Sequence, residues 1–99
     1  MKYVVSWESR PTASEELQAR GLQVFSKWSP SAGTTFHQFL GRVDGRGGYA
    51  VVETDNPALV AKDMAVFSAF FDMSVHPVME IADIAMIGAE AVEFRASIS

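Results

Sequence analysis

Residues 36–57, FHQFLGRVDGRGGYAVVETDNP, constrain the fold more than any other part of the chain. Two segments rich in β-branched and aromatic residues flank a glycine-rich turn, which is typical of a β-hairpin. The Asp44-Gly45 pair supplies the positive φ angles that a tight turn requires. Asn56 and Pro57 indicate the start of a helix, because Asn caps the first turn and Pro needs no hydrogen bond at the first helical position. This stretch therefore predicts a hairpin, with strands over 34–44 and 48–55, that leads directly into a helix.

The segments on either side of the hairpin complete the order of elements. Residues 2–7 and 71–81 alternate and are rich in strand-forming side chains, which predicts a first and a fourth strand. With a helix before the hairpin, the order is βαββαβ followed by a C-terminal helix. Right-handed crossovers then give a four-stranded antiparallel sheet with two helices on one face. The expected fold class is α+β, a ferredoxin-like domain that spans residues 1–99.

The helix boundaries follow from capping residues. The first helix is expected to begin at Thr12, which has the spacing of a capping box, or at the rival cap Ser14. Gly21 lies in the apolar stripe of this helix, where it is expected to mark a close contact with the sheet. Asp83 is the expected cap of the last helix. The apolar stripe of that helix consists of Ile84, Ile87, Ala91, Phe94 and Ile98.

Apolar side chains occur on both faces of the expected strands. Tyr3, Val5 and Trp7 alternate with Val4 in the first strand, and the hairpin strands show the same property. A sheet that is apolar on both faces is usually covered on both. Two helices cover one face only, so the sequence predicts a homodimer whose sheets pack face to face. The last helix is expected to dock on its own subunit or on the partner.

Composition excludes several classes of function. The net charge of −4, with no Lys/Arg cluster, argues against nucleic acid or an anionic membrane as a partner. The absence of cysteine excludes a disulfide framework, a thiol nucleophile and a zinc knuckle. No apolar run approaches the length of a membrane span or of a signal peptide, so a soluble cytoplasmic protein is expected. No ligand spacing supports a metal site, and no nucleotide or flavin motif indicates a cofactor.

The candidate site depends on the register of the hairpin. A two-residue loop at Gly45-Arg46 would pair Arg42 with Tyr49 and Gln38 with Glu53, and would put these four side chains on one face. His37 would then line the opposite face, together with Phe39 and Ala50. A three-residue loop would shift the register by one residue and bring Phe39 and Glu53 together instead. The two-residue loop is the preferred prediction.

These residue types suggest acid–base chemistry. His37 and His76 are the only side chains with an ordinary pKa near neutrality, so either is a candidate to move a proton, with Glu53 to assist. Arg42 is the candidate to hold an anionic group of the substrate. Tyr49, Gln38, Trp7 and Asp72 are the remaining candidates for ligand contacts. The competing interpretations are a polar cluster between strands, structural histidines and aromatic residues that fill the core.

The run FHQFLGRVDGRGGYAVVETDNP, the opening MKYVVSW and the phrase FSKWSP resemble the small bacterial family known as domain of unknown function 3303. The resemblance covers nearly the whole chain. It implies membership of the dimeric α+β barrel group, which includes cofactor-free monooxygenases, isomerases, polyketide cyclases and stress-responsive proteins. The implied fold agrees with the order of elements above, whereas the implied function is almost undefined.

Two functions from different classes are therefore expected. The first is a homodimeric barrel that binds a small, partly aromatic molecule and carries out proton transfer without a cofactor, as an isomerase, cyclase or monooxygenase. The second is a module without catalytic activity, either a ligand carrier or a stress-associated structural dimer. A cavity on which a histidine and a carboxylate converge would favour the enzyme. A cavity filled by Phe, Met and Trp would favour the module.

Overall fold

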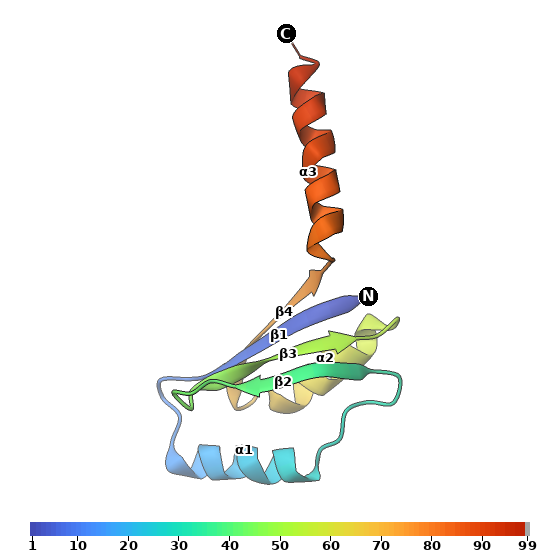
Figure 1. Ribbon diagram of the computed structural model, residues 1–99. Helices are drawn as coiled ribbons and strands as arrows, with labels where there is room; N and C mark the ends of the chain where they lie inside the picture. Colours follow the sequence, from blue (N-terminus) through green and yellow to red (C-terminus); the bar gives the residue numbers. More distant parts are fainter. Residues whose placement is uncertain (99) are drawn as a thin grey trace.

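The order of elements agrees with the ferredoxin-like prediction (Figure 1). A computed structural model describes residues 1–98, so that Ser99, the last residue of the expected domain, lies outside the described residues. The strands pair in the order β2-β3-β1-β4, and every neighbouring pair is antiparallel. The α+β fold class and the four-stranded antiparallel sheet are therefore confirmed. The elements are β1 (Lys2–Ser9), α1 (Glu15–Lys27), β2 (Thr35–Gly41), β3 (Gly47–Glu53), α2 (Pro57–Phe67), β4 (Phe71–Val78) and α3 (Ile81–Ala96).

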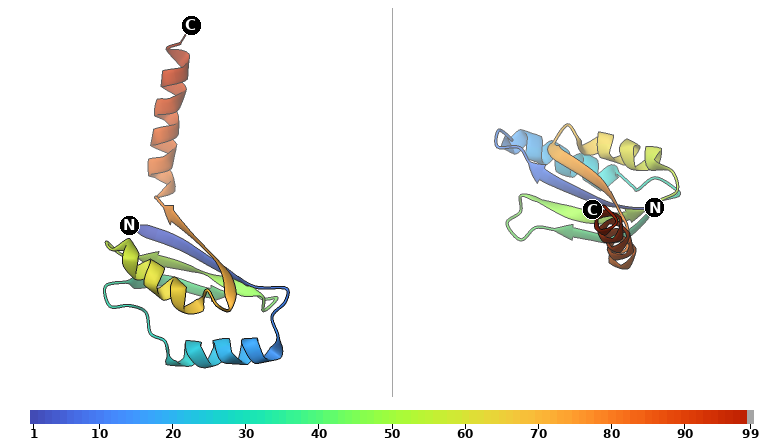
Figure 2. Two further views of the ribbon diagram at one scale, coloured as in Figure 1. Left: turned by 180° about the vertical axis from the view of Figure 1, so that it is seen from behind. Right: turned by 90° about the horizontal axis from the view of Figure 1, so that it is seen from above.

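The core lies between one face of the sheet and the helices α1 and α2, which are on the same side of it (Figure 2). Because side chains alternate along a strand, Tyr3 and Val5 of β1 share this face with Ala50 and Val52 of β3. Val60 of α2 completes this buried cluster. The other face of the sheet has no helix over it. We call it the open sheet face, and its central residues are Val4, Ser6, Gln38, Leu40, Tyr49, Val51, Ser74 and His76.

The helix starts agree in part with the expected caps. Ser14, and not Thr12, caps α1, and its Oγ accepts a hydrogen bond of 3.1 Å from the backbone N–H of Leu17. Asn56 caps α2 as expected, since its Oδ1 accepts from the backbone N–H of Ala58 at 3.1 Å. The prediction that Asp83 caps the last helix is wrong. The fourth strand ends at Val78, and α3 begins at Ile81 with no side-chain cap.

The predicted register of the hairpin is wrong by two residues. Leu40 pairs with Tyr49, and the backbone N–H of Arg42 donates to the carbonyl of Gly47 at 2.8 Å, which closes a four-residue loop. Gly45 has a positive φ of 73° and Arg46 does not, which excludes a type I′ turn with these two residues at its centre. The Asp44 carboxylate accepts from the backbone N–H of Arg46 at 2.9 Å and stabilises the longer turn.

A β-bulge in β2 overturns the predicted position of His37. The register shifts between Phe36 and Gln38, so Phe36 and Phe39 both lie on the helix-covered face, opposite Val52 and Ala50. An extra residue in a bulge breaks the strict alternation of side chains. His37 is that extra residue, and it contacts Glu53 instead of lying beside Phe39 and Ala50. The bulge thus lets two Phe rings that are three residues apart enter the same core.

The last helix does not dock on its own chain. None of the residues of α3 is buried, and Figures 1 and 2 show it projecting away from the sheet and from both other helices. The radius of gyration is 17.8 Å, whereas a compact domain of about 100 residues has roughly 13 Å. The structure does not show the expected docking of this helix on its own subunit, and docking on a partner stays a prediction. No helix among the described residues has the length and apolar character needed to cross a membrane.

Candidate functional site

The structure separates the predicted site residues into two regions. Trp7 lies on the helix-covered face of the sheet, among aromatic side chains. Gln38, Tyr49, Asp72 and His76 lie on the open sheet face, as their pairing with alternate residues of the neighbouring strands shows. His37 and Glu53 are together at one end of this face, and Arg42 is at the other. The two regions have different chemistry.

His37 and Glu53 form a close polar pair. His37 Nε2 lies 2.6 Å from Glu53 Oε1, and both side chains are about half exposed, at 41% and 47%. The hydrogen bond with His37 lowers the pKa of Glu53 below its ordinary value, and the charges of His37, Lys2 and the N-terminal ammonium act in the same direction. Desolvation opposes them. A hydrogen-bonded His and carboxylate of this kind can transfer a proton to or from a bound molecule.

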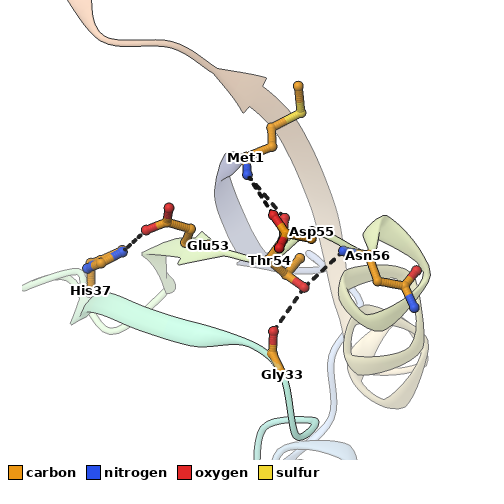
Figure 3. A network of polar contacts seen from close by, with 7 residues as sticks. All are labelled: Met1, Gly33, His37, Glu53, Thr54, Asp55 and Asn56. Atoms are coloured by element: carbon orange, nitrogen blue, oxygen red, sulfur yellow. Dashed lines mark hydrogen bonds and ion pairs between the residues drawn. The ribbon is translucent and has the colours of Figure 1, made fainter.

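The backbone that supports Glu53 is held by a network around Thr54 (Figure 3). Thr54 is buried, and its hydroxyl donates to the carbonyl of Gly33 at 3.0 Å and accepts from the backbone N–H of Asn56 at 3.2 Å. The N-terminal ammonium of Met1 donates to the Thr54 carbonyl at 3.2 Å. These bonds join the chain start, the end of β3, the start of α2 and the loop before β2. Glu53 therefore occupies a well-supported position.

Arg42 lies at the opposite end of the sheet from Glu53. Its guanidinium contacts the carboxylates of Glu8, at 3.3 Å, and Asp44. The hydrogen bond with Asp44 is the main cause of the raised pKa of Arg42. Arg42 is opposite Gly47, and the seven residues of β3 from Gly47 to Glu53 span about 20 Å. The expected grouping of Arg42 with Glu53 in one small polar pocket is therefore not what the structure shows.

The other polar candidates are dispersed over the open sheet face. His76 is opposite Val4, and among the described residues no hydrogen bond joins it to a carboxylate. Asp72 accepts a hydrogen bond of 3.1 Å from Arg10 Nε. Tyr49 is 49% exposed and is opposite Ser6, while Gln38 is opposite Val51. Within residues 1–98, no three His, Cys, Asp or Glu side chains come together in a group that could hold a metal ion.

A pocket of about 610 Å³ lies on the other side of the sheet, between α1 and the strands. We call it the aromatic pocket. The α1 side of its wall is formed by Leu17, Gly21 and Leu22, and Ser9 and Gln18 contribute the polar groups. No Asp, Glu, His, Lys or Arg side chain of the described residues lines it. Six rings surround it: Trp7, Phe25, Phe39, Phe67, Phe70 and Phe71.

The position of α1 keeps this pocket open. In the segment between β1 and α1, the Arg10 guanidinium donates to the carbonyls of Ser68 and Ala69 as well as to Asp72. After its end, the backbone N–H and the hydroxyl of Ser31 donate to the carboxylate of Asp63, which is only 3% exposed. These polar bonds fix the segments on either side of α1 to the segment between α2 and β4 and to α2. The helix itself borders the pocket from Leu17 to Phe25.

Aromatic contacts define the closed end of the pocket. Trp28 packs edge-to-face on Phe67, with ring centroids 5.1 Å apart, and Phe25 packs on Phe39 at 6.0 Å. Trp7 also contacts Phe39 edge-to-face, at 5.5 Å. Phe25 and Phe39 nevertheless remain 49% and 46% exposed, because the space beside them is unfilled. A second, more open depression of about 570 Å³ lies beside α1 and α2 and is lined in part by Arg20 and Lys27.

Of the predicted site residues, only Trp7 lines the aromatic pocket. Phe25, Phe67 and Phe70 were not identified from the sequence as pocket residues. The one available signal was Gly21, a small residue within a stripe of large ones. Its Cα faces the Phe70 ring and not the sheet itself, since a Cβ at this position would lie 3.5 Å from Phe70 Cγ.

Comparison with known proteins adds the family. The profile of the family described as Domain of unknown function (DUF3303) matches residues 1–92, which include all strands and most of α3. The chain belongs to this family. No curated protein matches the sequence. Because the description of the DUF3303 family states no activity, the function of this member has to be inferred from its own geometry.

Proposed function

We propose that this DUF3303 protein binds a small, flat and largely apolar molecule in the aromatic pocket. The observation that supports this most directly is an unfilled space of about 610 Å³ beside the half-exposed rings of Phe25 and Phe39. Ligand sites in proteins have volumes of about 300–1,000 Å³ and are mostly apolar, with a few polar groups. A well-packed core of this size would have no such space.

The lining indicates the chemistry of the ligand. Rings from the sheet and from α2 suit a planar molecule, because aromatic pairs favour stacked and edge-to-face contacts. The hydroxyl of Ser9 and the amide of Gln18 are the side-chain polar groups available to orient it. A charged ligand group would lose its hydration without gaining a partner in this pocket. We therefore expect a neutral ligand that makes one or two hydrogen bonds.

The pocket favours the carrier over the enzyme. Among residues 1–98, no titratable side chain lines the aromatic pocket, while His37 and Glu53 lie on the opposite face of the sheet. A proton-transfer reaction inside the pocket would therefore need a base that the lining does not supply. Binding, transport or sensing of the ligand needs only the pocket itself.

Proton transfer on the open sheet face is the second candidate function. It is favoured by the 2.6 Å contact between His37 and Glu53. His37 would accept the proton and Glu53 would orient the imidazole, while His76 remains a weaker candidate because no carboxylate contacts it among the described residues. Arg42 is too distant to bind the same small substrate. This candidate needs a cover over the open sheet face, because an exposed site cannot exclude water.

We further propose that the protein is a homodimer, with the open sheet face in its interface. Leu40 and Tyr49 are 54% and 49% exposed on this face, beside the partly exposed Val4 and Val51. A monomer would leave this apolar strip in water. The dimer would have a mass of about 22 kDa, twice the chain mass of 10.8 kDa.

Fluorescence of the neutral aromatic probe N-phenyl-1-naphthylamine tests the binding proposal. The wild type should enhance the emission of this probe saturably. Ala13 lines the pocket, so the larger side chain of Ala13→Trp should fill part of it and weaken probe binding by about tenfold or more. Ala19→Trp, on the exposed side of α1, is the control and should leave probe binding unchanged. His37→Ala should also leave it unchanged. No saturable binding by the wild type, or equal binding by both Trp variants, would exclude the pocket as the site.

A further inference from the structure

Helix α3 has the composition of a buried helix but lies fully in water. Its 16 residues contain four charged side chains, Asp83, Glu90, Glu93 and Arg95, and the rest are apolar or small. A helix that is apolar around most of its circumference is normally covered by protein on several sides. One face is particularly bulky, because residues three and four apart share a face. We call it the bulky face of α3. It consists of Ile84, Ile87, Ala91 and Phe94 of the helix, together with Ile98, which follows the helix end at Ala96.

The exposure of this face is large. Ile84 and Ile87 are 46% and 51% exposed, and Phe94 and Ile98 are 66% and 64% exposed. A contiguous patch of this kind on a soluble domain usually marks a contact with another molecule. The charged residue Glu93 is two positions from Ala91, hence roughly 200° around the helix from it, and can stay in water while the bulky face is covered. Asp83 and Glu90 are three or four positions from Ile87, so they lie at the border of the bulky face.

The same chain has a second surface without a cover, the open sheet face, on which apolar residues lie beside Ser6, Gln38, Ser74 and His76. Val4, Leu40, Tyr49, Val51 and Val78 lie on it. Figure 2 shows that α3 points away from this face in its own subunit. Only two residues, Met79 and Glu80, connect β4 to α3. Glu80 accepts a hydrogen bond of 3.1 Å from Lys2 Nζ, which holds this junction at the start of β1. The chain cannot cover its own sheet with α3 in this arrangement.

We propose that α3 of each copy lies across the open sheet face of a second copy, in a reciprocal exchange of C-terminal arms. This rests on the proposed dimer and identifies the element that covers the sheet. The lengths agree, since 16 helical residues extend about 24 Å and an eight-residue strand about 26 Å. In a single chain, α3 does not cover the open sheet face. In a two-fold symmetric dimer, α3 of each copy would cover the open sheet face of the other copy, and both contacts would be identical.

The area is sufficient for a stable dimer. The four large side chains of the bulky face would each remove on the order of 100 Å² from water when covered. The acceptor sheet would lose a similar area, and the two-fold axis doubles the contact. The total is roughly 1,600 Å², the usual size of a specific protein–protein interface. The arm exchange also places an apolar cover beside the His37–Glu53 pair of the partner, at the edge of the same face.

Disulfide cross-linking tests this arrangement directly, because the natural chain has no cysteine. The double variant Ser6→Cys/Ala91→Cys has one thiol on the open sheet face and one at the centre of the bulky face. It should form a covalent dimer on mild oxidation. The matched control Ser6→Cys/Ala89→Cys has its helix thiol on the other side of α3 and should not. Neither Ser6→Cys nor Ala91→Cys alone should form a covalent dimer.

Each other result identifies a different arrangement. Cross-linking by Ser6→Cys alone would mean that two sheets face each other, and cross-linking by Ala91→Cys alone that two α3 helices pair. A disulfide within one chain would mean that α3 folds back on its own sheet. Any of these three results overturns the exchange of arms. If the wild type sediments as a monomer at micromolar concentration, the proposed dimer is wrong as well. Probe binding to the aromatic pocket is a separate measurement, so this result would leave the binding proposal standing.

Substitution in the full chain gives a second, non-covalent test. Ala91→Lys introduces a charge at the centre of the bulky face and should raise the dimer dissociation constant by roughly 100-fold or more. Ala89→Lys adds the same charge on the other side of α3 and should change it little. Both residues are exposed in the single chain, so neither substitution should prevent folding. Equal dissociation constants for the two variants would contradict the proposal.

Discussion

Replacing Gly21 by Ala should stabilise the domain. Gly21 is buried in the middle of α1, and it has no positive φ that would require glycine. An added Cβ would lie 3.5 Å from Phe70 Cγ and 3.7 Å from Phe70 Cβ, which are ordinary van der Waals distances. Alanine is favoured over glycine inside a helix by about 0.8–1.0 kcal/mol. The new methyl group also covers part of the Phe70 ring, which adds up to about 0.5 kcal/mol.

The total gain of about 1–1.5 kcal/mol should raise the midpoint of urea unfolding, monitored by far-ultraviolet circular dichroism, without changing its slope. It corresponds to a rise in Tm of roughly 4–8 °C per kcal/mol for a domain of this size. Gly48→Ala is the matched control, because a Cβ there would lie 2.3 Å from the Leu40 carbonyl oxygen and 2.4 Å from Trp7 Cζ2, so its midpoint should fall. A lower midpoint for Gly21→Ala would mean that α1 lies closer to Phe70 than described here and that glycine is required for this contact.

Three further predictions follow from polar contacts and from α3. Asp63→Ala should lower the free energy of unfolding by about 1–3 kcal/mol, because it leaves both donors of Ser31 without their buried acceptor. A loss below about 0.5 kcal/mol in urea unfolding would show that the Ser31–Asp63 hydrogen bonds contribute little to stability. The carboxyl pKa of Glu53, followed by NMR titration, should lie below the ordinary value of 4.5 and rise in His37→Ala. Because the folded state lowers this pKa, the contribution of the pair to stability is present above pH 4.5 and is lost as the pH falls through the lowered pKa; an unchanged pKa in His37→Ala would refute the assignment. Phe94→Ala should cost the single domain far less than the roughly 3–5 kcal/mol of a buried Phe, since Phe94 is 66% exposed, and should instead weaken the dimer in sedimentation experiments.

Local signals in the sequence were sufficient to predict the order of the helices and strands. Alternation in residues 2–7 and 71–81 predicted the strands β1 and β4, although β4 ends at Val78, and it assigned Tyr3 and Val5 to one face. Asn56 and Pro57 marked the start of α2 because capping depends only on neighbouring backbone groups. The same reasoning offered Thr12 and Ser14 for α1 and could not choose between them, since both have suitable side chains at nearly the same position.

The site was less predictable because it depends on contacts between distant residues. The Asp44-Gly45 pair indicated a turn, but the length of the loop depended on the hydrogen bond between Asp44 and Arg46. That choice moved the register by two residues and separated Arg42 from Glu53. The aromatic pocket is a space between elements, and no periodicity in α1 distinguishes a side chain that borders a space from one that fills the core.

The sequence alone determined the fold class, the position of the hairpin, the start of α2 and the apolar character of both sheet faces and of the last helix. These properties follow from the side-chain period of each element and from local capping. Only the tertiary structure decided that His37 enters a bulge and meets Glu53, since Phe36 and Phe39 both have to pack against the rings of the core. It alone decided that α3 projects away from its own domain and leaves the sheet open. A period shows which residues share a face, but what covers that face is set by packing between segments far apart in the chain, or between two chains.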